Sequence, residues 1–437
     1  MPLPSSEGME SPSNRPQENV LVIGAGPVGL AIALRLALAG IEVDVIEKES
    51  SLGEEPRAVT YYASALIALN KMGVIPDIKK AGFVSEGFCW RKPICEDGHG
   101  GYKMGDVMAR LPIPREGSES LGGGGILYLP QPELTQLLFE KAIATGLVTV
   151  HFEENLIGIQ QDHSSVRATT KHDNTEKIFK ASYLVGADGG QSATRRLLDI
   201  HLKGHSWPEK LLSIDLLFED PSIDNEFPSQ FIVHPIHWGI VTPLKPVESG
   251  KRTLYRCAVS LDPEDKTPTD EINSPAHVVA LLEKMLPGPR PIKGKVIKSS
   301  LYRIHQLCAS TFRRGRCVLA GDAAHLNNPM GGMGLTTGLI DSEALCDILE
   351  MIILKGKACD LLDVYSNERA KAFQMFVDPQ SSQHKLRIQC DPELFHEDWL
   401  IQQLNSASPK LLEEFGLPFF QQWRVDMGEI ISNITVS

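Results

Sequence analysis

The sequence predicts an α/β fold: a discontinuous domain with a parallel sheet, a β-rich domain inserted into it, and a helical C-terminal segment. Three observations predict this fold. A strand, a glycine turn, a helix and a second strand follow one another through 20–47. Residues 317–320 form another short apolar run, which leads into a second glycine-rich loop and a long helix. Between these two parts, 211–300 is rich in the alternating and aromatic segments typical of strands.

The composition excludes several classes of protein. The chain has 437 residues, enough for two or three packed units, and its 42% hydrophobic and 22% charged residues are typical of a soluble globular protein. The net charge of −12 argues against broad nucleic-acid binding, which needs a basic surface. The eight cysteines form no CxxC pair, and no signal-like stretch opens the chain, so we expect a cytoplasmic location. The oligomeric state stays open.

The domain boundaries follow from changes in pattern along the chain. Residues 1–18 are rich in Pro, Ser, Glu and Asn, and we expect them to form a disordered leader. We assign 19–89, 126–200 and 301–355 to the discontinuous domain, 90–125 and 201–300 to the β-rich domain, and 356–437 to the helical C-terminal segment. The apolar run 344–354 is too short and too charged to cross a bilayer, so we expect no transmembrane segment.

The first unit is Rossmann-like. An apolar run at 20–23 suits a strand covered on both faces, and a GxGxxG turn follows it before an Ala/Leu-rich helix. Gly24 permits the tight turn, Gly26 lets a pyrophosphate approach the backbone, and Gly29 lets the helix pack closely on the strand. Glu47 ends the next strand, where a carboxylate can accept hydrogen bonds from an adenosine ribose. The unit predicts a dinucleotide site but does not say which dinucleotide binds.

Two later segments carry a family resemblance. GADGGQSATR at 186–195 and GRCVLAGDAAH at 315–325 resemble two motifs of the FAD-dependent aromatic monooxygenases (group A), the family of p-hydroxybenzoate and phenol hydroxylases. PMGGMG at 329–334 resembles the loop of that family that contacts the flavin, and PRA at 56–58 and LPQPEL at 129–134 are smaller matches. Thr336 and Ser342 depart from the family pattern, where Asn and Ala are frequent.

The resemblance implies one non-covalent FAD in the discontinuous domain. In this family an aspartate equivalent to Asp322 bonds the ribityl chain of FAD, and the loop before the long helix contacts the flavin. The first unit and the resemblance together assign to FAD the residues Gly24, Gly26, Val28, Gly29, Glu47, Lys48, Arg57, Gln131, Leu156, Asp188, Asp322, Pro329, Gly332, Met333, Gly334 and Leu335.

The resemblance also implies a reaction. NADPH or NADH reduces FAD as a transient co-substrate, O2 forms a flavin C4a-hydroperoxide, and one oxygen atom enters an aromatic small molecule, phenolic or polyketide-like, of secondary metabolism. Arg57 is expected to couple nicotinamide oxidation to product formation. His234 or His237 could remove the proton of a phenol. Phe231, Trp238 and Tyr255 are further candidates to line the substrate pocket. We expect no metal site, because the histidine pairs lack neighbouring cysteine or carboxylate ligands.

Other functions stay open at this point. A Baeyer–Villiger or epoxidising oxygenase, a halogenase, or a flavin reductase could share the fold. The Trp-x-Trp-x-Ile-Pro signature of halogenases is absent from the sequence, although WGIVTP at 238–243 lies in a comparable region. A non-enzymatic scaffold that binds FAD is a third class.

Overall fold

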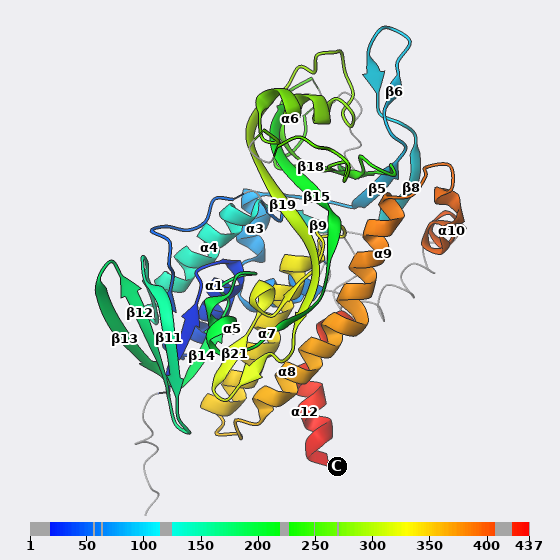
Figure 1. Ribbon diagram of the computed structural model, residues 1–437. Helices are drawn as coiled ribbons and strands as arrows, with labels where there is room; N and C mark the ends of the chain where they lie inside the picture. The colour runs from blue at the N-terminus through cyan, green and yellow to red at the C-terminus, as the bar shows by residue number, and fades with distance from the viewer. Residues whose placement is uncertain are drawn as a thin grey trace, which may run out of the picture.

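A computed structural model describes residues 18–55, 57–62, 64–113, 125–218, 227–248, 250–268, 271–406 and 422–436. It confirms the α/β fold, with the nucleotide-type domain and the β-rich domain joined along two long strands (Figure 1). Apart from Glu18, the predicted leader lies outside the described residues. None of the helices in these ranges is both long and apolar enough to cross a membrane.

The nucleotide-type domain is built on a six-stranded sheet, in which five strands are parallel and the edge strand β20 is antiparallel. In sheet order the strands are β10 (Val148–His151), β2 (Val43–Ile46), β1 (Val20–Ile23), β14 (Tyr183–Gly186), β21 (Cys317–Leu319) and β20 (Arg313–Arg314). The strands predicted at 20–23 and 317–320 therefore share one sheet. Their apolar runs are fully buried, as parallel strands covered on both faces require.

Helices and a small sheet enclose these strands. α1 (Pro27–Leu38) packs against α4 (Gln131–Ala144) and α7 (Met333–Ile353). α2 (Ser64–Lys71) packs on α7, and α3 (Ile75–Ala81) follows it. A three-stranded antiparallel sheet contributes to the same core and consists of β11 (Asn155–Gln161), β12 (Val166–His172) and β13 (Thr175–Ala181).

The β-rich domain is an eight-stranded sheet. Its order is β22 (His325–Leu326), β19 (Lys295–Ala309), β15 (Leu202–Phe218), β18 (Thr253–Ser260), β17 (Gly239–Pro243), β16 (Ser229–Ile232), β5 (Gly87–Arg91) and β8 (Val107–Pro112). β15 and β19 pair along most of their length and extend from the β-rich domain down beside the nucleotide-type domain (Figure 1). The sheet thus reaches beyond 90–125 and 201–300, and the domain boundaries stay a prediction.

The two faces of this sheet have different covers. One face packs on α6 (Pro275–Leu282) and forms a separate apolar cluster with Ile232, Val241 and Tyr255. The other face carries Phe231 and Trp238 and packs on the C-terminal helices and on Met330 of the glycine-rich loop. Since side chains alternate along a strand, this division decides which residues of the sheet can reach the glycine-rich loop.

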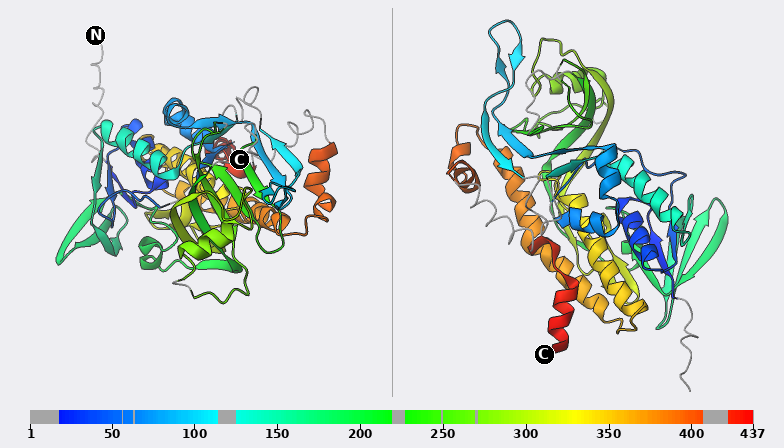
Figure 2. Two further views of the ribbon diagram at one scale, coloured as in Figure 1. Left: turned by 90° about the horizontal axis from the view of Figure 1, so that it is seen from above. Right: turned by 180° about the vertical axis from the view of Figure 1, so that it is seen from behind.

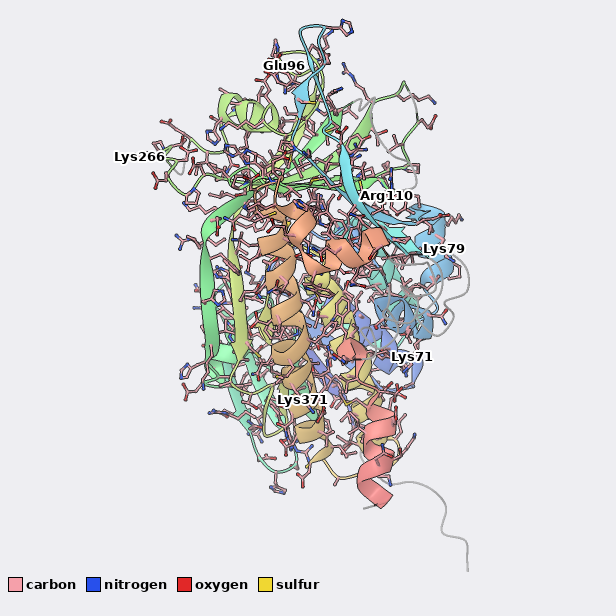
Figure 3. All side chains as sticks on the ribbon, turned by 90° about the vertical axis from the view of Figure 1, so that its right-hand side faces the viewer. Lys71, Lys79, Glu96, Arg110, Lys266 and Lys371 are labelled. Carbon is pink, nitrogen blue, oxygen red and sulfur yellow. The ribbon has the colours of Figure 1, made fainter. Side chains whose placement is uncertain are left out.

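The C-terminal segment is helical, as predicted. α8 (Leu361–Ala372), a π-helical turn η3 (Phe373–Val377) and α9 (Asp378–Ile388) follow one another along the molecule (Figure 3). η4 (Phe395–Glu397) and α10 (Trp399–Ser406) cover the edge strand β8, and α12 (Met427–Val436) contacts α7 and ends at the lower end of the molecule (Figure 2). The hairpin β6 (Cys95–Glu96) and β7 (Tyr102–Lys103) stands at the opposite end, where Figure 3 labels Glu96.

Candidate cofactor site

The glycine turn between β1 and α1 has the shape that a pyrophosphate needs. Gly24 has a φ of +105°, and a Cβ there would lie 2.5 Å from the carbonyl oxygen of Ala187. A Cβ at Gly29 would lie 2.0 Å from the carbonyl oxygen of Gly24. Above Gly26, in contrast, a Cβ would meet nothing within 4 Å, so the backbone faces open space. The turn and the N-terminus of α1 therefore fit a dinucleotide phosphate.

Glu47 closes this turn from the end of β2. Its Oε2 accepts a hydrogen bond from Ala25 N at 2.8 Å, and its Oε1 accepts one from Glu49 N at 2.9 Å. The side chain is half-buried, and each carboxylate oxygen keeps a second lone pair for a ribose hydroxyl. Lys48, by contrast, is exposed and pairs with Glu49 at 3.2 Å.

The second motif organises a turn and joins it to the third motif. Asp188 accepts hydrogen bonds from the Ser192 hydroxyl at 2.5 Å and from Thr194 N at 2.9 Å. Ser192 caps α5 (Ala193–Leu197), and Arg195 donates to the Ala323 carbonyl at 2.9 Å. Asp188 thus shapes the backbone, while a direct contact between Asp188 and the cofactor stays a prediction. The sequence interpretation left Arg195 out of the site, although its side chain joins the two motifs.

The third motif places Asp322 beside the first. It lies in the 3-10 turn η2 (Gly321–Ala323), and Val28 packs against Gly321, where a Cβ would lie 3.0 Å from a Val28 methyl group. Within the described residues the Asp322 carboxylate has no hydrogen-bond partner. Burial raises its pKa, while the Arg57 charge acts in the opposite direction. A partly buried carboxylate that lacks a donor fits a sugar-like hydroxyl of the ribityl chain.

Arg57 lies between the two domains. Its backbone carbonyl accepts a hydrogen bond from Arg256 of β18, and Arg256 forms a two-pronged ion pair with Asp215 of β15 at 2.8 and 2.9 Å. The Arg57 side chain is exposed, and its charge acts on Asp322 and on Tyr302 of β19. The β-rich sheet therefore fixes the backbone of a residue whose charge reaches the cofactor side.

The glycine-rich loop ends in the N-terminus of α7. Gly331 and Gly332 have φ values of +93° and +63°, a left-handed pair that other residues adopt with strain. Gly332 is the N-cap residue, so the N–H groups of Met333, Gly334 and Leu335 have no acceptor within the helix. Thr336, which departs from the family pattern, donates its hydroxyl to the Gly332 carbonyl at 3.0 Å. The loop thus presents free N–H groups and a positive dipole end, as the anionic edge of a reduced flavin requires.

Long-range hydrogen bonds hold this loop, and no pattern in the sequence indicated them. Asn328 N donates to Gln306 Oε1 of β19 at 2.7 Å, and Met330 N donates to Asn328 Oδ1 at 3.0 Å. Gln306 in turn donates to Asp378 Oδ1 of α9 at 2.5 Å. Asn328 and Gln306 are buried, so these bonds lie away from water. Only the fold brings the loop, β19 and α9 together.

A buried ion network lies behind the same motif. Asp341 of α7 accepts hydrogen bonds from His325 Nε2 at 2.7 Å, Arg369 Nε at 2.7 Å and Gly321 N at 3.0 Å. Burial acts to raise the pKa of Asp341, but His325 and Arg369 hold it below the ordinary value. The network fixes η2 against α7 and α8.

The substrate side of the loop is apolar, with a short polar row. Phe231 of β16 and Met330 of the loop belong to one buried cluster. On the same face of the sheet, Ser229 Oγ lies 3.2 Å from Thr242 Oγ1 and 2.8 Å from the Tyr128 hydroxyl. Tyr255 was expected to line this pocket, but it lies on the opposite face with α6. The strand register put it there, which the sequence pattern did not reveal.

The two candidate bases lie together in one loop. His234 and His237 occupy the loop before β17, and the ring centroids are 5.5 Å apart. His234 Nδ1 accepts from Ile236 N and His237 N at 3.0 and 2.9 Å, and His237 Nε2 lies 3.1 Å from Lys284 Nζ. Burial lowers the pKa of both rings. His234 N donates to the Ile388 carbonyl of α9 at 3.0 Å. Neither ring has a hydrogen bond to the glycine-rich loop among the described residues, and a role as base stays a prediction.

Three more residues predicted to contact FAD differ in their surroundings: Gln131, Leu156 and Pro329. Gln131 begins α4 and donates its N–H to the Ala58 carbonyl at 2.9 Å, which joins it to the Arg57 segment. The Leu156 side chain is buried in the main core, so contact with a ligand would run through its backbone. Pro329 is exposed at the start of the loop.

The sequence matches known proteins over most of its length. The profile of the family described as "FAD binding domain" matches 17–380. The chain is 32% identical over 367 residues to the para-nitrophenol 4-monooxygenase of Pseudomonas sp. (strain WBC-3), covering 84% of this chain and 86% of that protein. It is 30% identical over 367 residues to the 6-hydroxy-3-succinoylpyridine 3-monooxygenase HspB of Pseudomonas putida (strain DSM 28022 / S16), covering 84% and 88%.

The fold also matches a solved structure. The crystal structure of the p-nitrophenol 4-monooxygenase PnpA from Pseudomonas putida DLL-E4 superposes with a TM-score of 0.81 at 28% sequence identity. The match covers 93% of this chain and 98% of that chain. The architecture described above is therefore shared over nearly the whole length of both proteins.

Proposed function

The chain belongs to the group A FAD-dependent aromatic monooxygenases, and from that premise we propose that it hydroxylates a phenolic or related small aromatic molecule with O2 and NADPH or NADH. The observation that carries the proposal is that Met330 of the glycine-rich loop and Phe231 of the β-rich sheet belong to one buried apolar cluster. This cluster joins the candidate flavin site to an apolar, aromatic face of the sheet. The relatives named above act on nitrophenol and on a hydroxypyridine, which supports a hydroxylated aromatic ring as substrate.

The residues present fit FAD, which would supply the activation of oxygen. The Gly26 turn and the N-terminus of α1 would hold the pyrophosphate, Glu47 the ribose and Asp322 the ribityl chain. The N–H groups that open α7 would face the pyrimidine edge of the flavin. Phe231 and Met330 would keep water from the reacting ring, since exclusion of water protects a reactive intermediate.

The polar row on the sheet face would orient the substrate. Thr242, Ser229 and Tyr128 are linked through their hydroxyl groups, and each hydroxyl can donate as well as accept. A phenolic hydroxyl bound to Thr242 would join this row, which would hold the ring in one orientation, and His234 and His237 remain the candidate proton acceptors. All eight cysteines are free thiols, which supports a reducing cytoplasmic location.

An isotope experiment tests the reaction. The FAD-loaded protein is given NADPH or NADH, 18O2 and a panel of substituted phenols, including nitrophenols and hydroxypyridines. We expect at least one substrate to stimulate nicotinamide oxidation and to carry one 18O atom in the product. Label found only in water or peroxide, with the substrate reduced or dehydrogenated, would contradict a monooxygenase. A chloride-dependent product would indicate a halogenase instead.

A further inference from the structure

Two side chains contact the Gly331 peptide. The Tyr62 hydroxyl donates a hydrogen bond to the Gly331 carbonyl, and the His384 ring of α9 lies so close that a Cβ on Gly331 would be 2.8 Å from its Cδ2. Tyr62 also lines the next residue, since a Cβ on Gly332 would be 3.6 Å from its Cε1. The loop therefore has one polar contact, from Tyr62, and one packed ring, from His384.

The Gly331 peptide controls the direction of the groups that follow it. A peptide unit is planar, so fixing the Gly331 carbonyl also fixes the plane that contains Gly332 N. Gly332 N donates to the Pro329 carbonyl at 3.1 Å, and Gly332 is the N-cap of α7. Two consecutive glycines with positive φ have little intrinsic preference for one conformation. Outside contacts must therefore select the one that directs the N–H groups of Met333, Gly334 and Leu335.

The two side chains that contact Gly331 are themselves held by neighbours. Trp423, from the C-terminal segment, packs edge-on against Tyr62 with ring centroids 6.0 Å apart, and its Nε1 donates to Thr337 of α7 at 3.0 Å. Arg387 Nη1 lies 3.1 Å from His384 Nδ1 on α9. Burial, reinforced by the Arg387 charge, lowers the pKa of His384 to about 3, so its ring is neutral at physiological pH and adds no charge beside the loop.

We propose that Tyr62 and His384 are positioning residues that clamp the Gly331 peptide and so aim the N–H groups of α7 at the pyrimidine edge of the flavin. This inference rests on the proposed binding of FAD. The clamp makes the stabilisation of the anionic reduced flavin depend on two side chains outside the glycine motif itself. One comes from the segment between β3 (Thr60–Tyr61) and α2, and the other comes from α9. Loss of the clamp should affect reduced FAD more than oxidised FAD, because only the reduced form carries charge at that edge.

The test compares two adjacent tyrosines. Tyr62→Phe removes the hydroxyl that holds Gly331, whereas Tyr61→Phe removes a hydroxyl that has no partner among the described residues. The midpoint potential of bound FAD is measured by anaerobic reductive titration with a reference dye, without turnover. We expect about a tenfold weaker preference for reduced over oxidised FAD in Tyr62→Phe, or about 30 mV more negative for a two-electron couple. Tyr61→Phe should keep the parent potential.

A second variant tests the other side of the clamp. His384→Ala removes the ring that packs on Gly331 and should lower the potential in the same direction, while His201→Ala, at an exposed site, should leave it unchanged. Affinity for oxidised FAD should stay within about threefold of the parent in all four variants. Parent potentials in both Tyr62→Phe and His384→Ala would overturn the clamp and leave the proposed function intact. A parent protein that binds no FAD would instead overturn the proposed function.

Discussion

Asp322 and Arg57 show how single residues acquire a role from their surroundings. Asp322 is a partly buried carboxylate without a hydrogen-bond donor among the described residues, and Arg57 is the cation whose charge acts on it. Each residue owes its role to where it is held. The turn η2 positions Asp322, and Arg256, paired with Asp215, holds the backbone carbonyl of Arg57.

Asp322→Ala should weaken FAD binding about tenfold or more, because a charge-assisted hydrogen bond contributes about 1.5–3 kcal/mol. The measurement is a titration of FAD into the apoprotein, followed by flavin fluorescence. Asp360→Ala is the matched control, since the Asp360 side chain is 86% exposed. Equal affinities of the two variants would remove Asp322 from the site.

Arg57→Lys should uncouple the reaction. Lysine keeps the charge but loses the planar fork of donors, so it cannot reproduce an arginine contact. We expect more hydrogen peroxide per NADPH or NADH oxidised, with unchanged thermal stability because the side chain is exposed. Arg167→Lys, an exposed site on β12, should couple as the parent does. Identical peroxide yields in all three proteins would assign Arg57 to the surface.

At the scale of elements, α9 has an importance that its polar sequence does not suggest. Asp378, His384 and Lys385 contact Gln306, Gly331 and Glu209 in turn, so one face of the helix meets the cofactor loop and the sheet. Lys385 and Glu209 form a buried ion pair at 2.7 Å. A shift of α9 would separate the two side chains and leave their charges buried and unpaired, which is costly. The intact pair therefore fixes α9 in one register.

The half-buried His384 ring makes the stability of the holoenzyme depend on pH. Its pKa falls from 6.5 to about 3 on folding through burial and the Arg387 charge, while Asp398 acts in the opposite direction. Between these values the unfolded chain binds a proton that the folded protein does not, so this contribution is full above about 6.5 and is lost as the pH falls.

His384→Gln should therefore flatten the decline in the free energy of unfolding between pH 6.5 and 5, a decline that one group can steepen by at most about 1.4 kcal/mol per pH unit. Denaturant unfolding of the FAD-bound protein at several pH values measures it. His201→Gln, whose ring is 78% exposed, serves as the control and should keep the slope of the parent. A parent-like slope in His384→Gln would show that His384 does not stay neutral on folding.

At the scale of the whole molecule, the C-terminal segment packs on the nucleotide-type domain through hydrogen bonds and ion pairs. Arg369 donates to the carbonyl groups of Trp423 and Arg424 at 2.7 and 3.1 Å, and Arg424 pairs with Glu343 of α7 at 2.7 Å. Trp423 is completely buried among Thr337, Tyr62 and Phe376. These contacts tie the end of the chain to the start of α7.

Trp423→Ala should destabilise the protein by about 3–5 kcal/mol, since it empties a buried tryptophan site, and should lower the fraction of protein that keeps FAD. Thermal unfolding of the apo and FAD-bound forms measures both effects. Trp399→Ala on α10 is the control, because Trp399 is 62% exposed and its removal should change stability by no more than about 0.5 kcal/mol. Equal unfolding temperatures for the two variants would contradict a structural role for Trp423.

Much of the fold and part of the site could be predicted from the sequence. The strands near 20 and 317 and the helix after the glycine loop are where the patterns predicted them, because burial on both faces and glycine turns leave short-range signals. The Gly24, Gly26 and Gly29 geometry follows from the same local chemistry. Tyr255 was attractive as an aromatic residue in a β-rich region, but composition does not say which face of a sheet a residue occupies.

The sequence by itself determined the order of the motifs and the backbone of each turn, because these depend on φ and ψ preferences and on hydrogen bonds between near neighbours. The FAD-binding family followed from the resemblance of those motifs to the motifs of known monooxygenases. The tertiary structure alone decided how the cofactor loop is held: by Gln306 from β19, Tyr62 from the segment after β3 and His384 from α9. These contacts join residues far apart in the chain. A shift of one residue in the register of β19 would turn the Gln306 side chain to the other face of the sheet, so only the packed fold fixes its contact with the loop.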